Sequence, residues 1–88
     1  MKQLSGQFGL TVRRAREQLG WSQEVLADRA SLNRSYLGEV ERGSAMPSLA
    51  TIAKLAAALN TNISELLARC ENQGDAFEEP SALIRFGN

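Results

Sequence analysis

The sequence predicts an all-α protein, a compact bundle of five helices followed by a C-terminal tail. Apolar residues recur at steps of three and four along most of the 88-residue chain, and strand-like alternation is absent until the last eight residues. Residues that suit helix caps stand between the apolar stretches. The hydrophobic fraction of 43% is enough for one small core, so we expect a single folded domain.

The first two helices are expected at 8–19 and 22–30. Gly20 is well placed to end the first helix in a left-handed conformation, and the Ser22 hydroxyl can cap the free amides of the second. Each helix has apolar residues on one face, which predicts burial of that face. These residues are Phe8, Val12, Ala15 and Leu19 in the first helix, and Leu26, Ala27 and Ala30 in the second.

The third helix is expected at 34–42, after a turn of about three residues. Asn33 suits its N-cap and Gly43 its end, and Leu37 and Val40 would face the core. A fourth helix is expected at 49–59, because Pro47 favours a loop before it. Its apolar stripe, expected to face the core, is Leu49, Ile52, Leu55, Ala56 and Leu59. A fifth is expected at 62–70. The polar residues at their ends are Ser48 as N-cap, Asn60 as left-handed stop, and Asn62 with Glu65 as a capping box.

Charge divides the chain into two parts. Residues 1–70 carry nine Lys and Arg against six Asp and Glu, a balance of +3, whereas residues 71–88 carry a balance of −3. We therefore expect a folded domain at 1–70 and an acidic linker with an apolar C-terminal segment at 71–88. A modestly basic body is compatible with phosphate binding, although local placement matters more than net charge.

The residue inventory argues against an enzyme. The chain has no His and one Cys, Cys70, so the usual zinc-ligand sets and His-based catalytic arrangements cannot be built. No apolar run approaches the roughly 20 residues of a membrane-spanning helix. Residues 1–10 do not resemble a secretory signal. We expect a cytoplasmic protein that needs no metal or cofactor and contacts no membrane.

The second and third helices with their short turn form a helix-turn-helix. The small side chain of Ala27 lets the two helices cross closely, and Leu26, Leu32, Leu37 and Val40 would lock the crossing into the core. The first turn of the third helix would then project outward. A projecting helix of this width fits the major groove of DNA.

Short motifs follow in order along the chain: Gly20-Trp21-Ser22-Gln23, Leu26-Ala27, Glu41-Arg42-Gly43 and Pro47-Ser48-Leu49. Together they are similar to the phage-repressor (Cro/repressor, XRE-type) helix-turn-helix family, over about residues 8–67. The run Asn33-Arg34-Ser35-Tyr36-Leu37 before Glu41 resembles restriction-modification controller proteins in particular. The resemblance implies a lambda repressor-like fold and a repressor or controller that binds specific double-stranded DNA. The chain departs from the family at Ser31, where glycine is frequent because the turn favours a positive φ.

The resemblance implies that the third helix reads bases, and its side chains suit that role. Arg34 is the strongest candidate, because its planar guanidinium can grip O6 and N7 of guanine, and contact with a phosphate is its competing use. Ser35 can bond base edges or phosphate, and Glu39 can accept a hydrogen bond from cytosine N4. For Tyr36 two uses are equally open: contact with a thymine methyl or a phosphate, and packing against the first helix.

Four polar side chains are expected at phosphates. They are Ser22, Gln23, Asn33 and Arg42. Gln23 can donate its amide to a phosphate at the start of the second helix. For Asn33 the helix cap is the favoured use, and Arg42 also suits the negative C-terminal end of its own helix.

The resemblance implies further roles for charged residues. Arg16 and Glu41 would form a structural ion pair between the first and third helices. Glu24 and Asp28 lie four residues apart on the second helix, where relatives can touch RNA polymerase. The favoured alternative for these two acids is a solvated patch near a helix N-terminus.

We expect a homodimer on a palindromic operator, because one such domain reads only a few base pairs. Two surfaces could build the dimer: apolar residues of the fifth helix near Cys70, which the resemblance favours, or residues 83–86 paired between subunits. The tail could instead fold back on its own domain. The alternative function is an antitoxin-like module that uses the helix-turn-helix fold and the tail to hold a protein partner.

Overall fold

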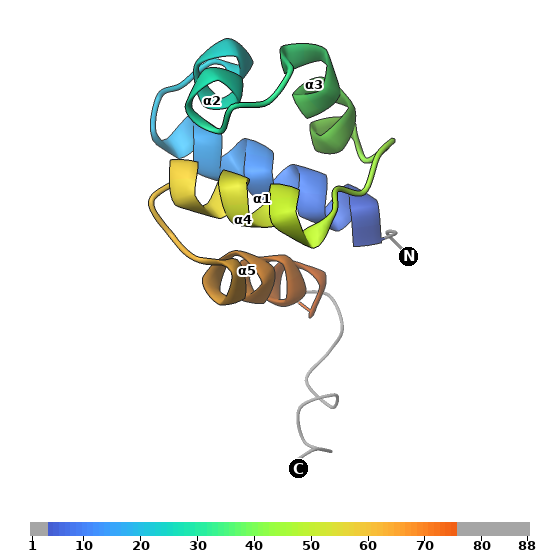
Figure 1. Cartoon of the computed structure of the whole chain (residues 1–88). Coiled ribbons are helices and arrows are strands. Elements are labelled where there is room, and N and C mark those ends of the chain that lie inside the picture. Colours follow the sequence, from blue (N-terminus) through green and yellow to red (C-terminus); the bar gives the residue numbers. More distant parts are fainter. Residues whose placement is uncertain (1–3, 76–88) are drawn as a thin grey trace.

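The computed structural model describes residues 4–75, which form five helices and no strand (Figure 1). The all-α prediction is confirmed. The helices are α1 (Leu4–Gln18), α2 (Gln23–Arg29), α3 (Arg34–Arg42), α4 (Leu49–Ala58) and α5 (Ile63–Asp75). The predicted apolar C-terminal segment, with the dimer contact assigned to it, lies outside the described residues.

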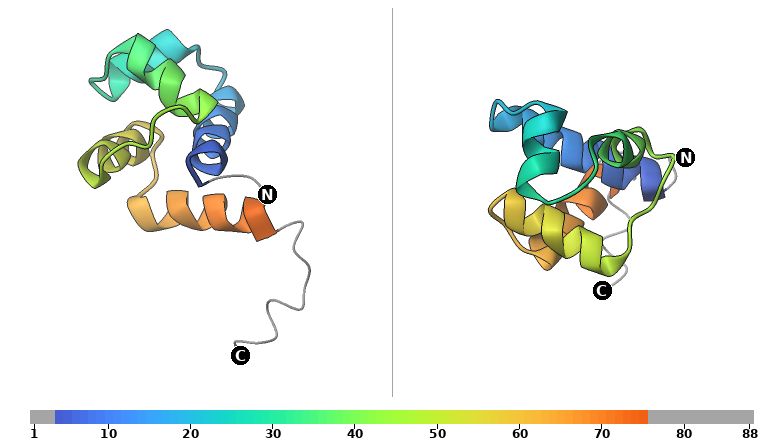
Figure 2. Two further views of the ribbon diagram at one scale, coloured as in Figure 1. Left: turned by 90° about the vertical axis from the view of Figure 1, so that its right-hand side faces the viewer. Right: turned by 45° about the horizontal axis from the view of Figure 1, so that its top comes forward.

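Helix α1 runs through the middle of the bundle and packs against both α3 and α5. The helix pair α2 and α3 lies on one side of α1, and α5 lies on the opposite side, in both the front view and the view turned by 90° (Figures 1 and 2). Helix α4 contacts α2 and α5 and closes the bundle. The helix-turn-helix therefore occupies one end of the molecule.

The core is built by apolar residues from all five helices. The large side chains with no exposed surface are Phe8, Val12, Leu26, Leu37, Val40, Leu55 and Leu66. Two predicted core residues are instead exposed: Leu19 retains 46% of its accessible surface and Leu49 retains 65%. Leu19 follows the last residue of α1 and Leu49 is the first residue of α4, so both lie at helix ends beyond the packed interior.

The predicted N-caps are confirmed by their hydrogen bonds. Ser22 Oγ accepts from the Val25 amide, Asn33 Oδ1 from the Ser35 and Tyr36 amides, Ser48 Oγ from the Thr51 amide, and Asn62 Oδ1 from the Glu65 amide. The left-handed stops are confirmed as well, with φ of 76° at Gly20, 83° at Gly43 and 64° at Asn60. These side chains act on neighbours in sequence, so local chemistry places the helix starts.

Two helices are longer than expected. Helix α1 begins at Leu4, four residues before its predicted start, and α5 continues to Asp75, five residues beyond Cys70. The first part of the segment interpreted as an acidic linker is therefore helical. Cys70 itself is buried in the core, as expected for a small apolar residue on a helix.

The contact between α1 and α3 brings backbone against backbone. A Cβ at Gly9 would overlap the carbonyl oxygen of Val40 and would lie 2.6 Å from that of Glu41. A Cβ at Gly43 would lie 2.8 Å from the Cα of Gly6. Only glycine allows this approach, which fixes where α3 sits on α1.

Candidate nucleic-acid interface

The first turn of α3 lies on the surface, while the rest of the helix is anchored in the core. Asn33, Arg34 and Ser35 are exposed, and Leu37 and Val40 are fully buried. The Asn33 side chain caps the helix, with distances of 2.8 Å to the Ser35 amide and 3.1 Å to the Tyr36 amide. The helix therefore presents its N-terminal residues on a rigid support.

The four predicted base readers have different surroundings. Arg34, Ser35 and Glu39 are exposed, and Ser35 and Glu39 lie one helical turn apart on the same face. Tyr36 is half-buried and its ring packs against the core. Packing against the first helix and contact with DNA both stay predictions for Tyr36, because it packs against the core as a whole and part of its side chain is accessible.

A buried ion pair joins α1 to α3. Arg16 Nε donates to Glu41 Oε2 at 2.8 Å, and the guanidinium also donates to Glu41 Oε1 at 2.9 Å. A further N–H of Arg16 donates to the Trp21 carbonyl at 2.8 Å, ahead of α2. The hydrogen bond to Glu41 raises the pKa of Arg16. This bidentate geometry is the strong form of an Arg–carboxylate contact.

Gln23 lies beside this pair. Its Nε2 donates to Glu41 Oε1 at 3.0 Å, so α2 is tied to the same carboxylate. Sequence reasoning missed this bond, because an exposed amide at the start of a helix-turn-helix also suits a phosphate. The bond uses one of the two amide N–H groups and fixes which way the amide faces.

The remaining predicted phosphate residues, Ser22 and Arg42, are exposed. The Ser22 hydroxyl is already the cap of α2, at 3.1 Å from the Val25 amide. Arg42 occupies the last turn of α3, and its Nη1 lies above Gly38. The Gln23 amide oxygen also lies above Gly38, so side chains from both helices of the motif border this residue.

Local backbone strain marks the turn of the motif. Ser31 has a φ of 57°, in the left-handed region that favours glycine. Ser31, which stands where the family often has glycine, therefore adopts the backbone conformation that favours glycine. On α2, the Arg29 guanidinium stacks on the Trp21 ring at 4.6 Å from the ring centroid. The acidic residues Glu24 and Asp28 of the same helix are exposed.

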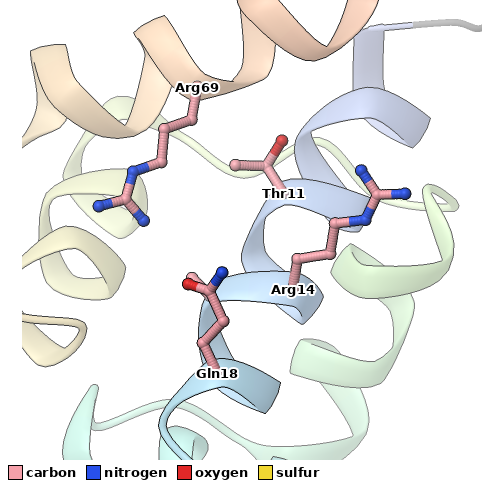
Figure 3. Close-up of a pocket in the computed structure, with 5 residues that line it drawn as sticks. Thr11, Arg14, Gln18 and Arg69 are labelled. Atoms are coloured by element: carbon pink, nitrogen blue, oxygen red, sulfur yellow. The ribbon is translucent and has the colours of Figure 1, made fainter.

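Among the hollows on the described part of the surface, two border α5, away from α3. The first, of about 260 Å³ between α1 and α5, is lined partly by Arg14 and Arg69, whose guanidinium groups point to opposite sides (Figure 3). The second is a shallow groove between α4 and α5. We call it the α4–α5 groove. The residues that line it are Ala53, Ala56, Ala57, Thr61, Asn62, Ile63, Ser64 and Leu67.

The chemistry of other sites is limited within residues 4–75. No group of three or more His, Cys, Asp or Glu side chains is gathered there to hold a metal ion. None of the described helices has the length and apolar character needed to cross a membrane. The Cys70 thiol is buried, and this desolvation raises its pKa.

Comparison with known proteins identifies relatives that share this architecture. Residues 12–66 match the protein family described as Helix-turn-helix. The HTH-type transcriptional regulator SutR of Escherichia coli is 29% identical over 91% of this chain and 45% of its own length. Control protein C.SmaI of Serratia marcescens is 48% identical over 54% of this chain and 57% of its own length. The chain thus spans about half the length of these two curated relatives.

A solved structure supports the same assignment. The restriction-modification controller protein C.AhdI from Aeromonas hydrophila superimposes with a TM-score of 0.68 and 47% sequence identity, over 70% of this chain and 94% of that one. The predicted resemblance to the phage-repressor class, and to controller proteins within it, is confirmed.

Proposed function

The chain belongs to the helix-turn-helix family of transcription regulators, and we propose that it binds a specific double-stranded DNA sequence by inserting α3 into the major groove. The observation that carries this proposal is the exposure of Asn33, Arg34 and Ser35 on a helix whose Leu37 and Val40 are fully buried. A rigid, projecting first turn is the part of such a motif that can reach base edges.

Base reading is assigned to the exposed positions of α3. Arg34 can donate two hydrogen bonds to one guanine, and Glu39 can accept from cytosine while repelling misplaced phosphates. Ser35 lies between them on the helix face, and the accessible edge of Tyr36 can meet a thymine methyl. Asn33 serves as the helix cap and can add a phosphate contact through its amide nitrogen.

Affinity is assigned to groups beside the reading turn. Ser22 and Gln23 lie at the start of α2 and Arg42 in the last turn of α3, and contacts of such residues to the DNA backbone set position rather than sequence preference. Arg16 and Glu41 support these contacts from inside the bundle through their ion pair.

The regulator acts as a homodimer on a palindromic operator in this proposal. Two copies place their reading helices about 34 Å apart, one turn of DNA. The α4–α5 groove offers an apolar surface on α5 for the dimer, in line with the predicted contact through the fifth helix. The tail beyond Asp75 is the other candidate surface.

The proposal includes the setting. We propose that the protein works in the cytoplasm as a repressor or controller, needs no cofactor and carries out no enzymatic reaction, and the family match supports this proposal. The exposed pair Glu24 and Asp28 on α2 is available for contact with RNA polymerase next to the DNA. C.SmaI and C.AhdI are named as a control protein and a restriction-modification controller protein, so control of such genes is the narrower form of the proposal.

Selection of bound duplexes from a random DNA pool tests the proposal. We expect a palindromic sequence to be enriched. Arg34→Ala should weaken binding to that sequence by about 1–3 kcal/mol and relax the preference at one base pair of each half-site. An equal loss on every duplex would overturn the role of Arg34, and failure of the parent protein to bind any duplex at low salt would overturn the function.

A further inference from the structure

Gly38 lies in the interior of α3 and is buried although it has no side chain. Glycine is among the poorest residues for a helix interior, and Ala at the same place would favour the helix. The backbone here is helical, so no positive φ calls for glycine. Its presence therefore needs a reason outside the helix itself.

The space above Gly38 is taken by the ends of two side chains. A Cβ at this position would lie 3.2 Å from Arg42 Nη1 and 3.8 Å from Gln23 Oε1. The contact differs from that of Gly9, where a Cβ would meet the backbone of α3. Gly38 thus makes room for the Arg42 guanidinium rather than for a neighbouring helix, while the Gln23 amide would stay in ordinary van der Waals contact.

The orientation of Gln23 follows from Glu41. The Glu41 carboxylate can only accept, so the Gln23 amide must turn its nitrogen toward it, and the bond measures 3.0 Å. The carbonyl oxygen of Gln23 then faces the Arg42 side. Arg16 compensates the charge of Glu41 at 2.8 Å, and Arg42 is exposed, so an outside anion can reach its guanidinium.

We infer that Gly38 is an affinity-determining position, because its missing side chain keeps open a cradle in which the Arg42 guanidinium, with the Gln23 carbonyl oxygen beside it, holds one phosphate of the DNA backbone. The inference rests on the proposed DNA-binding function. Arg42 supplies a charged pair of N–H donors for the phosphate, and the Gln23 oxygen, which can only accept, borders the cradle without contacting the phosphate. Glu41 is a positioning residue, since it acts only through Gln23.

The test measures DNA binding and protein stability in the same variants. Gly38→Ala and Gly38→Leu put side chains of increasing size under Arg42. A mixed-sequence duplex at about 50 mM salt serves as the probe, because phosphate contacts do not depend on sequence. We expect affinity to fall about threefold for Ala and at least about tenfold for Leu. The midpoint of thermal unfolding of Gly38→Ala should rise, since Ala favours the helix.

Arg42→Ala removes the proposed phosphate-binding group, and Arg69→Ala is its matched control. Arg42→Ala should weaken binding and make it less dependent on salt, by about 0.9 in the log–log slope for each phosphate that the variant no longer binds. Arg69→Ala removes the same charge from α5 and should leave the slope nearly unchanged. Adding Gly38→Ala to Arg42→Ala should cost no further affinity, because the group that the methyl displaces is gone.

The outcomes separate the inference from the function. Parental affinity in both Gly38 variants would overturn the cradle while leaving the regulator intact. A loss of affinity accompanied by a lower unfolding midpoint in Gly38→Ala would also overturn it, since damage to α3 would then explain the loss. Absence of binding by the parent protein would instead refute the function on which the inference rests.

Discussion

At the scale of single residues, the Glu41 carboxylate connects three helices. It belongs to α3 and accepts hydrogen bonds from Arg16 of α1 and from Gln23 of α2. Only 8% of Glu41 and 9% of Arg16 are exposed to solvent. Removing one partner of such a pair leaves the other charge buried and uncompensated, which costs far more than losing a surface contact.

Glu41→Ala is therefore expected to lower the free energy of unfolding by about 3 kcal/mol. The measurement is urea unfolding at neutral pH. The matched control is Glu17→Ala, which removes the exposed partner of Arg13 at 3.1 Å. Exposed pairs contribute little, so this change should cost less than about 0.5 kcal/mol. Equal losses in the two variants would contradict the structural role of Glu41.

Sequence reasoning reached the Arg16–Glu41 pair only through the family resemblance, and it missed the bond from Gln23 to Glu41. Gln23 and Glu41 are 18 positions apart along the chain, and their contact depends on how α2 crosses α3. A side-chain type alone does not reveal that crossing. The Asn33 cap could be predicted, because its partners lie two and three residues away.

At the scale of helices, most starts and stops follow from nearby residues, whereas the packing of helix ends does not. Ser22, Ser48 and Asn60 perform the capping and stopping roles that their chemistry predicts. Leu19 and Leu49 fit the apolar periodicity and are nevertheless exposed. An apolar residue at a helix end is buried only where another element covers it, and periodicity within one helix carries no information about that cover.

The contact between α1 and α3 makes Gly9 a sensitive position. Gly9→Ala favours helix α1 by about 1 kcal/mol, but the added methyl overlaps two carbonyl oxygens of α3. Backbone cannot yield as a flexible side chain does, so overpacking prevails and the net loss should be about 2 kcal/mol. Thermal or urea unfolding measures the difference.

Gly38→Ala is the internal comparison for this prediction. Both substitutions add one methyl to a helical glycine, yet the new Cβ at 38 meets only side-chain ends. Gly9→Ala should destabilise and Gly38→Ala should not. The opposite order would show that α1 and α3 approach each other less closely than the structure has them.

At the scale of the whole molecule, the surface proposed for DNA and the surface proposed for the dimer use different elements. The α4–α5 groove contains no residue of α2 or α3. Leu66 of α5 is fully buried in its own core, so only Ile63 and Leu67 leave apolar surface from this helix in the groove. A change in the groove can therefore separate dimer assembly from the DNA contacts of α3.

Ala57→Asp tests this separation. Ala57 lines the groove and is exposed, so a charge there should disturb the fold little. Buried against a second copy, the same carboxylate would lie unpaired in an apolar interface and weaken the dimer at least about tenfold. Sedimentation equilibrium measures the dimer, and affinity for a palindromic duplex should fall with it, since each monomer holds only one half-site.

Ala50→Asp is the control for Ala57→Asp, because Ala50 is an exposed alanine of the same helix outside the groove. It should leave the dimer intact, and its position in the first turn of α4 is one where a carboxylate is favourable. If Ala57→Asp also stays dimeric, the groove is not the interface. Truncation after Asp75 then decides whether the chain beyond α5 joins the two copies, because a monomeric truncated protein would assign the contact to that segment.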